Sequence, residues 1–195
     1  MTQELLRLGP AVDADVIARA LGKGQGVQLD LSLTNDLGEA GAVVEEHSVL
    51  LSQLAMFDAH EVKQVRLALE EAVANAIMHG NLEIDKSLRE VDYLEWMSQL
   101  KSRPMEPRYV DRRVKVTIRL GVREVEYEIG DDGQGFDVAA LPAKEAQDAV
   151  TTCGGRGLML MRSAMDVVSH NSRGNRLTLI KRRRVETGKP DSSKT

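Results

Sequence analysis

The sequence predicts an α/β fold, a two-layer sandwich in which helices cover one face of a mixed, mostly antiparallel sheet. Three observations predict it. Alternating apolar residues indicate half-buried strands at 27–33, 114–120 and 122–129. Apolar residues at three- and four-residue spacing indicate helices packed on the sheet. Gly121 separates the second alternating run from the third, which is typical of a hairpin.

Length and composition limit the class of protein. The chain has 195 residues, enough for one domain with extensions, and 42% of them are hydrophobic, which supports a core. The net charge of −4 does not indicate general affinity for nucleic acid. Cys153 is the single cysteine, which excludes an intramolecular disulfide and fits a reducing cytosol. No apolar run approaches the roughly 18 residues of a membrane span, and no signal peptide is recognisable. We therefore expect a cytoplasmic protein without membrane contact.

The first half of the chain contains the clearest helix signals. Residues 1–25 are expected to be an N-terminal extension or linker, with a short helix as the alternative, and residues 26–185 are expected to form the main domain. Asn35 or Asp36 caps a helix that runs roughly from Leu37 to Met56. Asp58 caps the next, which runs to about His79 and stops at Gly80. The expected buried face of this second helix consists of Val62, Val65, Leu69, Val73 and Ala76.

The second half alternates between polar segments and short apolar ones. Residues 82–110 are expected to be an insertion, with one helix near Ser87–Leu100 followed by an extended connector. Residues 137–156 are expected to form a lid within a long segment rich in Gly, Ala and Asp. A helix is expected from Leu158 to Met165, and closing strands are expected at 166–170 and 176–182. The tail, 186–195, is expected to be disordered.

Three polar residues share one stripe of the second helix. Glu71, Asn75 and His79 stand at positions i, i+4 and i+8. A carboxylate such as Glu71 can take a proton from water or a hydroxyl, and the neutral oxygen of Asn75 suits Mg²⁺ beside a triphosphate. The alternative is that both residues only solvate an exposed helix face. Glu70 stands four residues after Arg66, so we interpret it as half of a solvated ion pair.

Asp131 follows a predicted strand, in a loop where Gly133 and Gly135 allow close backbone approach. Its carboxylate can accept a hydrogen bond from the exocyclic amine of adenine, and Phe136 is expected to anchor the turn in the core. The alternative is a simple Asp-Gly turn, which is common in proteins.

A glycine-rich segment opens the helix that follows the expected lid. It contains Gly154, Gly155 and Gly157, and the free N–H groups at such a helix start favour phosphate. Arg156 either adds positive charge there or points into solvent. A glycine-rich lid without a ligand is the alternative. The segment is not a P-loop, because no Gly-Lys-Ser/Thr follows.

Taken in order, Glu-x-x-x-Asn, Asp-x-Gly-x-Gly-Phe and Gly-x-Gly-Leu resemble the motif boxes of the GHKL superfamily of ATPases, in its anti-sigma-factor serine kinase branch. The resemblance covers roughly residues 27–184 and implies an ATP-binding fold of the Bergerat type. It implies that Glu71 is the general base, Asn75 the magnesium ligand and Asp131 the residue that recognises adenine. It also implies ATP contacts for His79 and Arg156, and for the motif residues Gly133, Gly135, Gly155, Gly157 and Leu158.

Two segments differ from the pattern of this branch. Gly174 and Asn175 stand where these proteins often carry Gly-Thr, and Thr178 nearby is expected to be a strand residue. The 82–110 segment is longer than the usual link, and we interpret it either as a partner-binding surface or as a decorative insertion.

The resemblance implies ATP and Mg²⁺ as cofactors and an ATP-dependent serine/threonine protein kinase as the function. Its expected substrate is a small antagonist protein of the STAS type in bacterial partner switching, with a sigma factor or another regulator as a further partner and a homodimer as the expected assembly. One alternative is a non-catalytic module in which ATP gates protein binding. Another is the catalytic fragment of a histidine kinase, but His47 and His60 lie too close to Asn75 to leave room for a phosphoacceptor hairpin.

Overall fold

The computed structural model describes residues 5–8, 13–141 and 155–184. These residues contain one six-stranded sheet with the strand order β1-β2-β3-β4-β6-β5. The strands are β1 (Leu5–Leu8), β2 (Gly26–Leu33), β3 (Val114–Leu120), β4 (Glu124–Gly130), β5 (Val167–His170) and β6 (Arg176–Arg182). Strand β1 runs parallel to β2, and every other neighbouring pair is antiparallel. The predicted mixed, mostly antiparallel sheet is confirmed.

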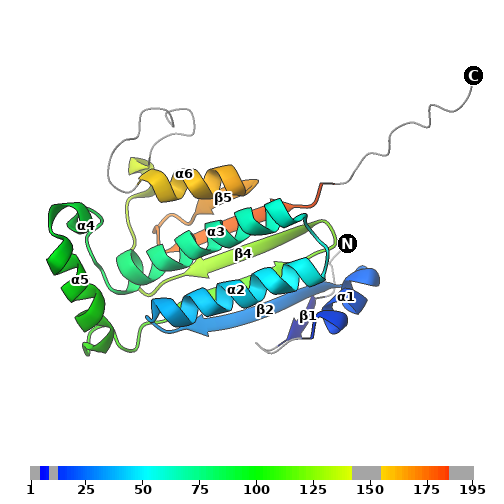
Figure 1. Cartoon of the computed structure of the whole chain (residues 1–195), viewed down its shortest axis with the longest axis horizontal. Coiled ribbons are helices and arrows are strands. Elements are labelled where there is room, and N and C mark those ends of the chain that lie inside the picture. The colour runs from blue at the N-terminus through cyan, green and yellow to red at the C-terminus, as the bar shows by residue number, and fades with distance from the viewer. Residues whose placement is uncertain (1–4, 9–12, 142–154, 185–195) are drawn as a thin grey trace, which may run out of the picture.

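Three long helices lie against one face of the sheet (Figure 1). They are α2 (Leu37–Gln53), α3 (Ala59–Asn75) and α6 (Gly155–Ala164). Away from this layer, α1 (Ala14–Gly22) lies beside β1 and β2, and α4 (Leu88–Val91) and α5 (Tyr93–Ser102) project at the opposite end of the sheet. The two-layer α/β sandwich expected from the sequence is therefore confirmed. No helix among the described residues is both long enough and apolar enough to cross a membrane.

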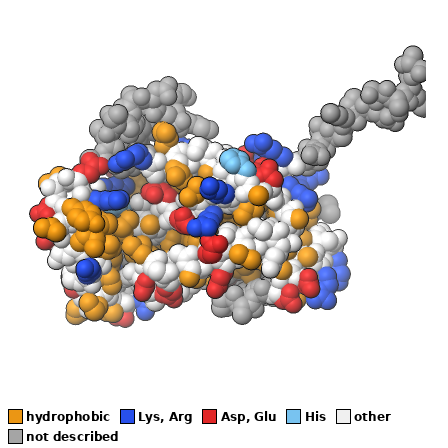
Figure 2. All heavy atoms as spheres, viewed as in Figure 1, with side chains coloured by type: hydrophobic (Ala, Val, Ile, Leu, Met, Phe, Trp, Pro, Cys, Tyr) orange, Lys and Arg blue, Asp and Glu red, His pale blue; other side chains and the backbone are white. Residues whose placement is uncertain are grey.

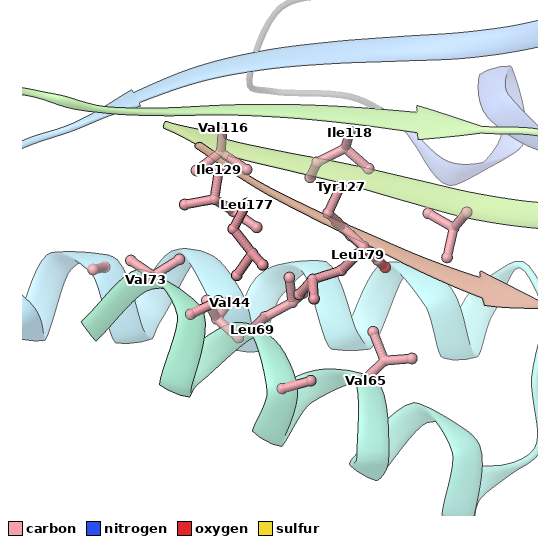
Figure 3. Close-up of a cluster of buried hydrophobic side chains, with 14 of the residues drawn as sticks. Val44, Val65, Leu69, Val73, Val116, Ile118, Tyr127, Ile129, Leu177 and Leu179 are labelled. Carbon is pink, nitrogen blue, oxygen red and sulfur yellow. The ribbon is translucent and has the colours of Figure 1, made fainter. Parts of the chain in front are cut away.

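The hydrophobic core fills the space between the helices and the sheet. The predicted buried face of α3 is confirmed: Val65 is fully buried, and Val62, Leu69, Val73 and Ala76 are each at most 8% exposed. Figure 3 shows α3 side chains together with Val44 of α2 directed toward side chains of the sheet, among them Ile118, Tyr127 and Leu179. The other sheet face carries charged residues that pair across strands, including Arg176 with Glu128 at 3.2 Å.

Side-chain caps place the helices that build the site. Asp36 caps α2 by accepting hydrogen bonds from the backbone N–H groups of Gly38 and Glu39, at 2.7 and 3.2 Å. Asp58 and Glu61 form a reciprocal capping box at the start of α3. Both helix starts agree with the sequence prediction. Helix α2 ends at Gln53, three residues before the predicted Met56.

The expected stop of α3 at Gly80 is wrong. The helical chain continues through a π-helical turn over Ala76–Asn81, in which the N–H of Leu82 bonds to the carbonyl of Ile77 at 2.8 Å. Gly80 lies inside this turn because the chain there passes close to Asp131. A Cβ at position 80 would stand 2.7 Å from both carboxylate oxygens of Asp131.

The expected single helix at 87–100 is also wrong, because Asp92 divides it. The backbone of Asp92 is extended, and its side chain accepts from the N–H of Glu95, so that α5 starts anew after α4. A 3₁₀ turn (Arg103–Met105) and further turns replace the expected extended connector.

At the N-terminus, the sequence pattern does not predict β1, whereas α1 matches the helix alternative. A 3₁₀ turn (Val138–Ala140) lies in the segment expected to be a lid; most of that segment and the whole tail at 186–195 fall outside the described residues.

Candidate functional site

One cavity of about 580 Å³ brings together most of the residues that the sequence motifs single out. It lies between α3, the π-helical turn, the loop after β4, the start of α6 and the 82–105 segment. Its lining includes, of the predicted site residues, Glu71, Asn75, His79, Asp131, Gly135, Arg156, Gly157 and Leu158. Gly133 is buried next to Asp131, and Gly155 is the first residue of α6. Three motifs separated by up to 87 positions in the chain therefore meet at one cavity.

Glu71 and Asn75 interact directly on the cavity wall. The Nδ2 of Asn75 donates a hydrogen bond to Oε1 of Glu71 at 2.7 Å, one turn earlier in α3. This contact holds the carboxylate in one rotamer, and it directs the amide nitrogen rather than the amide oxygen toward Glu71. The Oδ1 of Asn75 is thus left as the oxygen that a divalent cation would use.

The start of α6 packs directly over Glu71. A Cβ at Gly157 would stand 2.5 Å from the carboxyl carbon of Glu71 and 2.9 Å from its Cγ. Only glycine allows this approach. The carboxylate therefore lies between its own helix and the first turn of α6.

Asp131 sits at the other end of the cavity, in a tightly packed loop. Its Oδ1 accepts a hydrogen bond from the N–H of Gly133 at 2.9 Å, and its own N–H bonds to the carbonyl of Asn175 at 3.0 Å. A Cβ at Gly133 would stand 2.8 Å from Oδ1 of Asp131. Partial burial raises the pKa of the Asp131 carboxyl above its ordinary value. The loop thus fixes the carboxylate and leaves its second oxygen as an acceptor.

Gly174 and Asn175 stand beside this loop. Gly174 lines the cavity. The Nδ2 of Asn175 donates a hydrogen bond to the backbone carbonyl of Asp131 at 3.3 Å. Thr178 lies in β6 opposite Glu128, as expected for a strand residue.

His79 closes the π-helical turn. Its Nδ1 donates to the carbonyl of Ile84 at 2.7 Å, and burial lowers the pKa of the ring. The imidazole therefore links the turn to the segment that follows it.

Two buried asparagines, Asn35 and Asn81, join this turn to the Asp131 loop, a role that the sequence does not predict for them. Asn81, which is fully buried, donates to Oδ1 of Asn35 at 2.8 Å and accepts from the N–H of Asp132 at 2.8 Å. Asn35 in turn donates to the carbonyl of Tyr109 at 2.9 Å. Asn81 and Asn35 are 46 positions apart, so no local sequence signal connects them.

The 82–105 segment also contributes to the cavity, through Lys86, Arg89, Glu90 and Trp96. Arg156 of α6 points largely into solvent, with its side chain 88% exposed, and forms an ion pair with Glu90 at 3.5 Å. Further along the segment, large apolar side chains are exposed, and Figure 2 shows hydrophobic side chains gathered over the α4 and α5 end. They include Val91, Tyr93, Leu94 and Met105.

The expectation that Phe136 anchors its turn in the core is wrong. The side chain is 37% exposed and packs edge-on against His170, with 5.3 Å between the ring centroids. Phe136 lines the cavity, and Gly174 packs closely against its backbone: a Cβ at Gly174 would stand 2.8 Å from the Phe136 nitrogen.

The donor set fits a magnesium ion held mainly by a nucleotide. Within the described ranges, no group of three or more His, Cys, Asp or Glu side chains could hold a metal ion alone. Mg²⁺ commonly takes one or two protein oxygens and completes its shell with phosphates and water. Asn75 would supply the protein oxygen.

Comparison with known proteins agrees with this geometry. A family described as the histidine kinase-like ATPase domain matches residues 33–181. No curated protein matches the chain. The matched range runs from the end of β2 into β6 and includes every element that lines the cavity.

Proposed function

The chain belongs to the family of histidine kinase-like ATPase domains, and from that premise we propose that it is an ATP- and Mg²⁺-dependent serine/threonine kinase of the anti-sigma-factor type. Its substrate would be a small antagonist protein of the STAS type. The observation that carries the proposal is the 2.7 Å contact between Glu71 and Asn75 on the wall of the cavity that also contains Asp131.

In the proposed reaction, different residues of the cavity bind adenine, activate the substrate serine and hold the phosphates. Asp131 accepts a hydrogen bond from the exocyclic amine of adenine. Glu71 takes the hydroxyl proton of a substrate serine. At the same time the serine oxygen bonds to the γ-phosphorus of ATP, and the bond between the γ-phosphorus and the leaving ADP breaks. Mg²⁺ held by Asn75 would neutralise phosphate charge. Backbone N–H groups at the start of α6 are suited to bind phosphate oxygens.

The histidine-kinase alternative is weakened by the surroundings of His47. That ring is only 6% exposed, its Nε2 is 2.8 Å from the Tyr127 hydroxyl, and burial lowers its pKa to about 4. A phosphoacceptor must present its ring to the bound nucleotide, whereas His47 is a core residue.

One observation favours a second candidate, an ATP-gated binding module without phosphate transfer. Because Gly157 packs on Glu71, the carboxylate faces α6 rather than an open approach for a serine. In such a module, movement of α6 with bound nucleotide would alter a protein-binding surface.

Phosphate transfer separates the two candidates. The purified chain would be incubated with γ-labelled ATP, Mg²⁺ and single-domain STAS-type proteins, as wild type, Glu71→Gln and Glu70→Gln. Glu70 is the matched control, because it is bonded to Arg66 at 2.8 Å on the exposed side of the same helix, as the sequence indicated. The proposal expects transfer by wild type and Glu70→Gln and its loss in Glu71→Gln. ATP binding without transfer to any of these proteins would favour the gated module.

A further inference from the structure

The 82–105 segment is fixed in place at both of its ends. At its start, Glu83 forms ion pairs with Arg108 at 2.6 Å and Arg112 at 2.9 Å. At its end, the guanidinium of Arg103 donates to the carbonyl of Leu82 at 2.6 Å. The segment is therefore a fixed wall of the cavity rather than a loose decoration on its rim.

Two cations on this wall are oriented by aromatic rings. The Nζ of Lys86 lies 5.2 Å from the centroid of the Phe136 ring, and the guanidinium of Arg89 lies 5.3 Å from that of Trp96. A ring face positions a cation without cancelling its charge. In the part of the chain that the structure describes, neither cation has a carboxylate oxygen within 4.0 Å.

The other arginines of the cavity lining differ in this respect. Arg156 is paired with Glu90 at 3.5 Å, and Arg176 is paired with Glu128 at 3.2 Å. Burial lowers the pKa of both His79 and His170, which line the cavity, and the positive charge of Lys86 lowers the pKa of each ring further. Lys86 and Arg89 therefore supply positive charge that the described protein groups do not neutralise.

We propose that Lys86 and Arg89 bind the phosphate groups of the nucleotide from the wall of the cavity that the 82–105 segment forms. This inference rests on the proposed function, because it assumes that ATP occupies the cavity. It gives the inserted segment a nucleotide-binding role, in place of the partner surface or decorative insertion expected from the sequence. A polyphosphate carries negative charge that would pair with these two cationic side chains, whereas adenosine carries no charge.

The test compares two ligands that differ only in phosphate. Calorimetry at low ionic strength would measure ATP and adenosine binding to wild type, Lys86→Met and Arg89→Met. Methionine keeps an unbranched apolar stem against the ring and removes the charge. Lys101→Met is the matched control, since Lys101 lies in the last turn of α5, is exposed and does not line the cavity.

Each cavity variant is expected to bind ATP about tenfold more weakly than wild type, the scale of one charge-assisted hydrogen bond. Adenosine affinity and the Lys101→Met control should stay unchanged, and added salt should narrow the ATP difference. Unchanged ATP affinity in both variants would overturn the inference while leaving the proposed function intact, and so would an equal loss for ATP and adenosine. A wild-type chain that binds no ATP would remove the proposed function and this inference with it.

Discussion

Replacing Gly157 by alanine tests whether the packing of α6 on Glu71 sets the geometry of the proposed base. The added Cβ would stand 2.5 Å from the Glu71 carboxyl carbon, whereas ordinary contacts begin at 3.4 Å. Oε1 of Glu71 would be closer still, so either the carboxyl group or the start of α6 must move by at least about 1 Å. A misplacement of about 1 Å can lower a rate about 100-fold. We expect a loss of that order in single-turnover phosphate transfer from labelled ATP.

The Gly157→Ala substitution should stabilise α6 through helix propensity even as it lowers the transfer rate, and a glycine elsewhere provides the control. Alanine favours a helix over glycine by about 0.8–1 kcal/mol, so Gly157→Ala is not expected to act by unfolding α6. Gly41→Ala in α2 is the matched substitution, because a Cβ there meets nothing within 4 Å. It should raise the free energy of unfolding and leave the transfer rate unchanged. If Gly157→Ala transfers phosphate at the wild-type rate, the Glu71 geometry does not depend on α6 and the reasoning is refuted.

Three further substitutions probe the rest of the cavity. Asp131→Asn should weaken ATP binding by about 1.5–3 kcal/mol in calorimetry, because adenine loses a charged acceptor. It should also raise the melting temperature of the nucleotide-free protein at pH 7. Burial raises the pKa of the Asp131 carboxyl above its ordinary value of 3.8. The wild type therefore loses stability as the pH rises through that raised pKa, and asparagine has no such loss. Asn75→Ala should leave the fold intact and abolish the Mg²⁺ dependence of ATP binding. Asn81→Ala should lower the free energy of unfolding in urea by about 2 kcal/mol, because the buried Asn35 side chain and the backbone N–H of Asp132 lose their hydrogen bonds.

For each of these three substitutions, a specific result would contradict the expected effect. Equal ATP affinity in Asp131→Asn would reject the adenine contact, and a gain in melting temperature that does not shrink toward pH 4 would reject burial of the charge as its cause. Mg²⁺ dependence that survives Asn75→Ala would place the metal elsewhere. A urea midpoint unchanged by Asn81→Ala would show that the asparagine contacts add no stability.

The central layer of the fold could be predicted because its signals are local. Alternation fixed β2, β3 and β4 to within two residues at each end, and the Asp36 and Asp58 caps placed the starts of α2 and α3. The stripe of Glu71, Asn75 and His79 followed from helical periodicity alone. That the three motifs face one cavity depended on the family resemblance, because spacing along the chain carries no information on distance in space.

The errors arose where tertiary contacts decide local structure. Gly80 resembles a helix stop in the sequence, but the helical chain continues through it as a π-helical turn. The close approach of Asp131 explains why glycine stands at this position. The apolar pattern at 87–100 indicated one helix, yet Val91 and Leu94 are 79% and 80% exposed, so burial does not enforce that pattern. Phe136 was assigned to the core from its residue type, although its turn faces the cavity. The Asn81–Asn35 contact joins distant segments and has no signature in either.

The position of Trp96 has a practical consequence. It is the only tryptophan of the chain, and it lines the cavity. Its ring lies 5.6 Å from the ring of Tyr93 and 5.3 Å from the guanidinium of Arg89. An indole in such a place is an intrinsic fluorophore whose emission responds to its surroundings. The arrival and departure of a nucleotide could therefore be followed in real time by stopped-flow fluorescence, without any label attached to the protein.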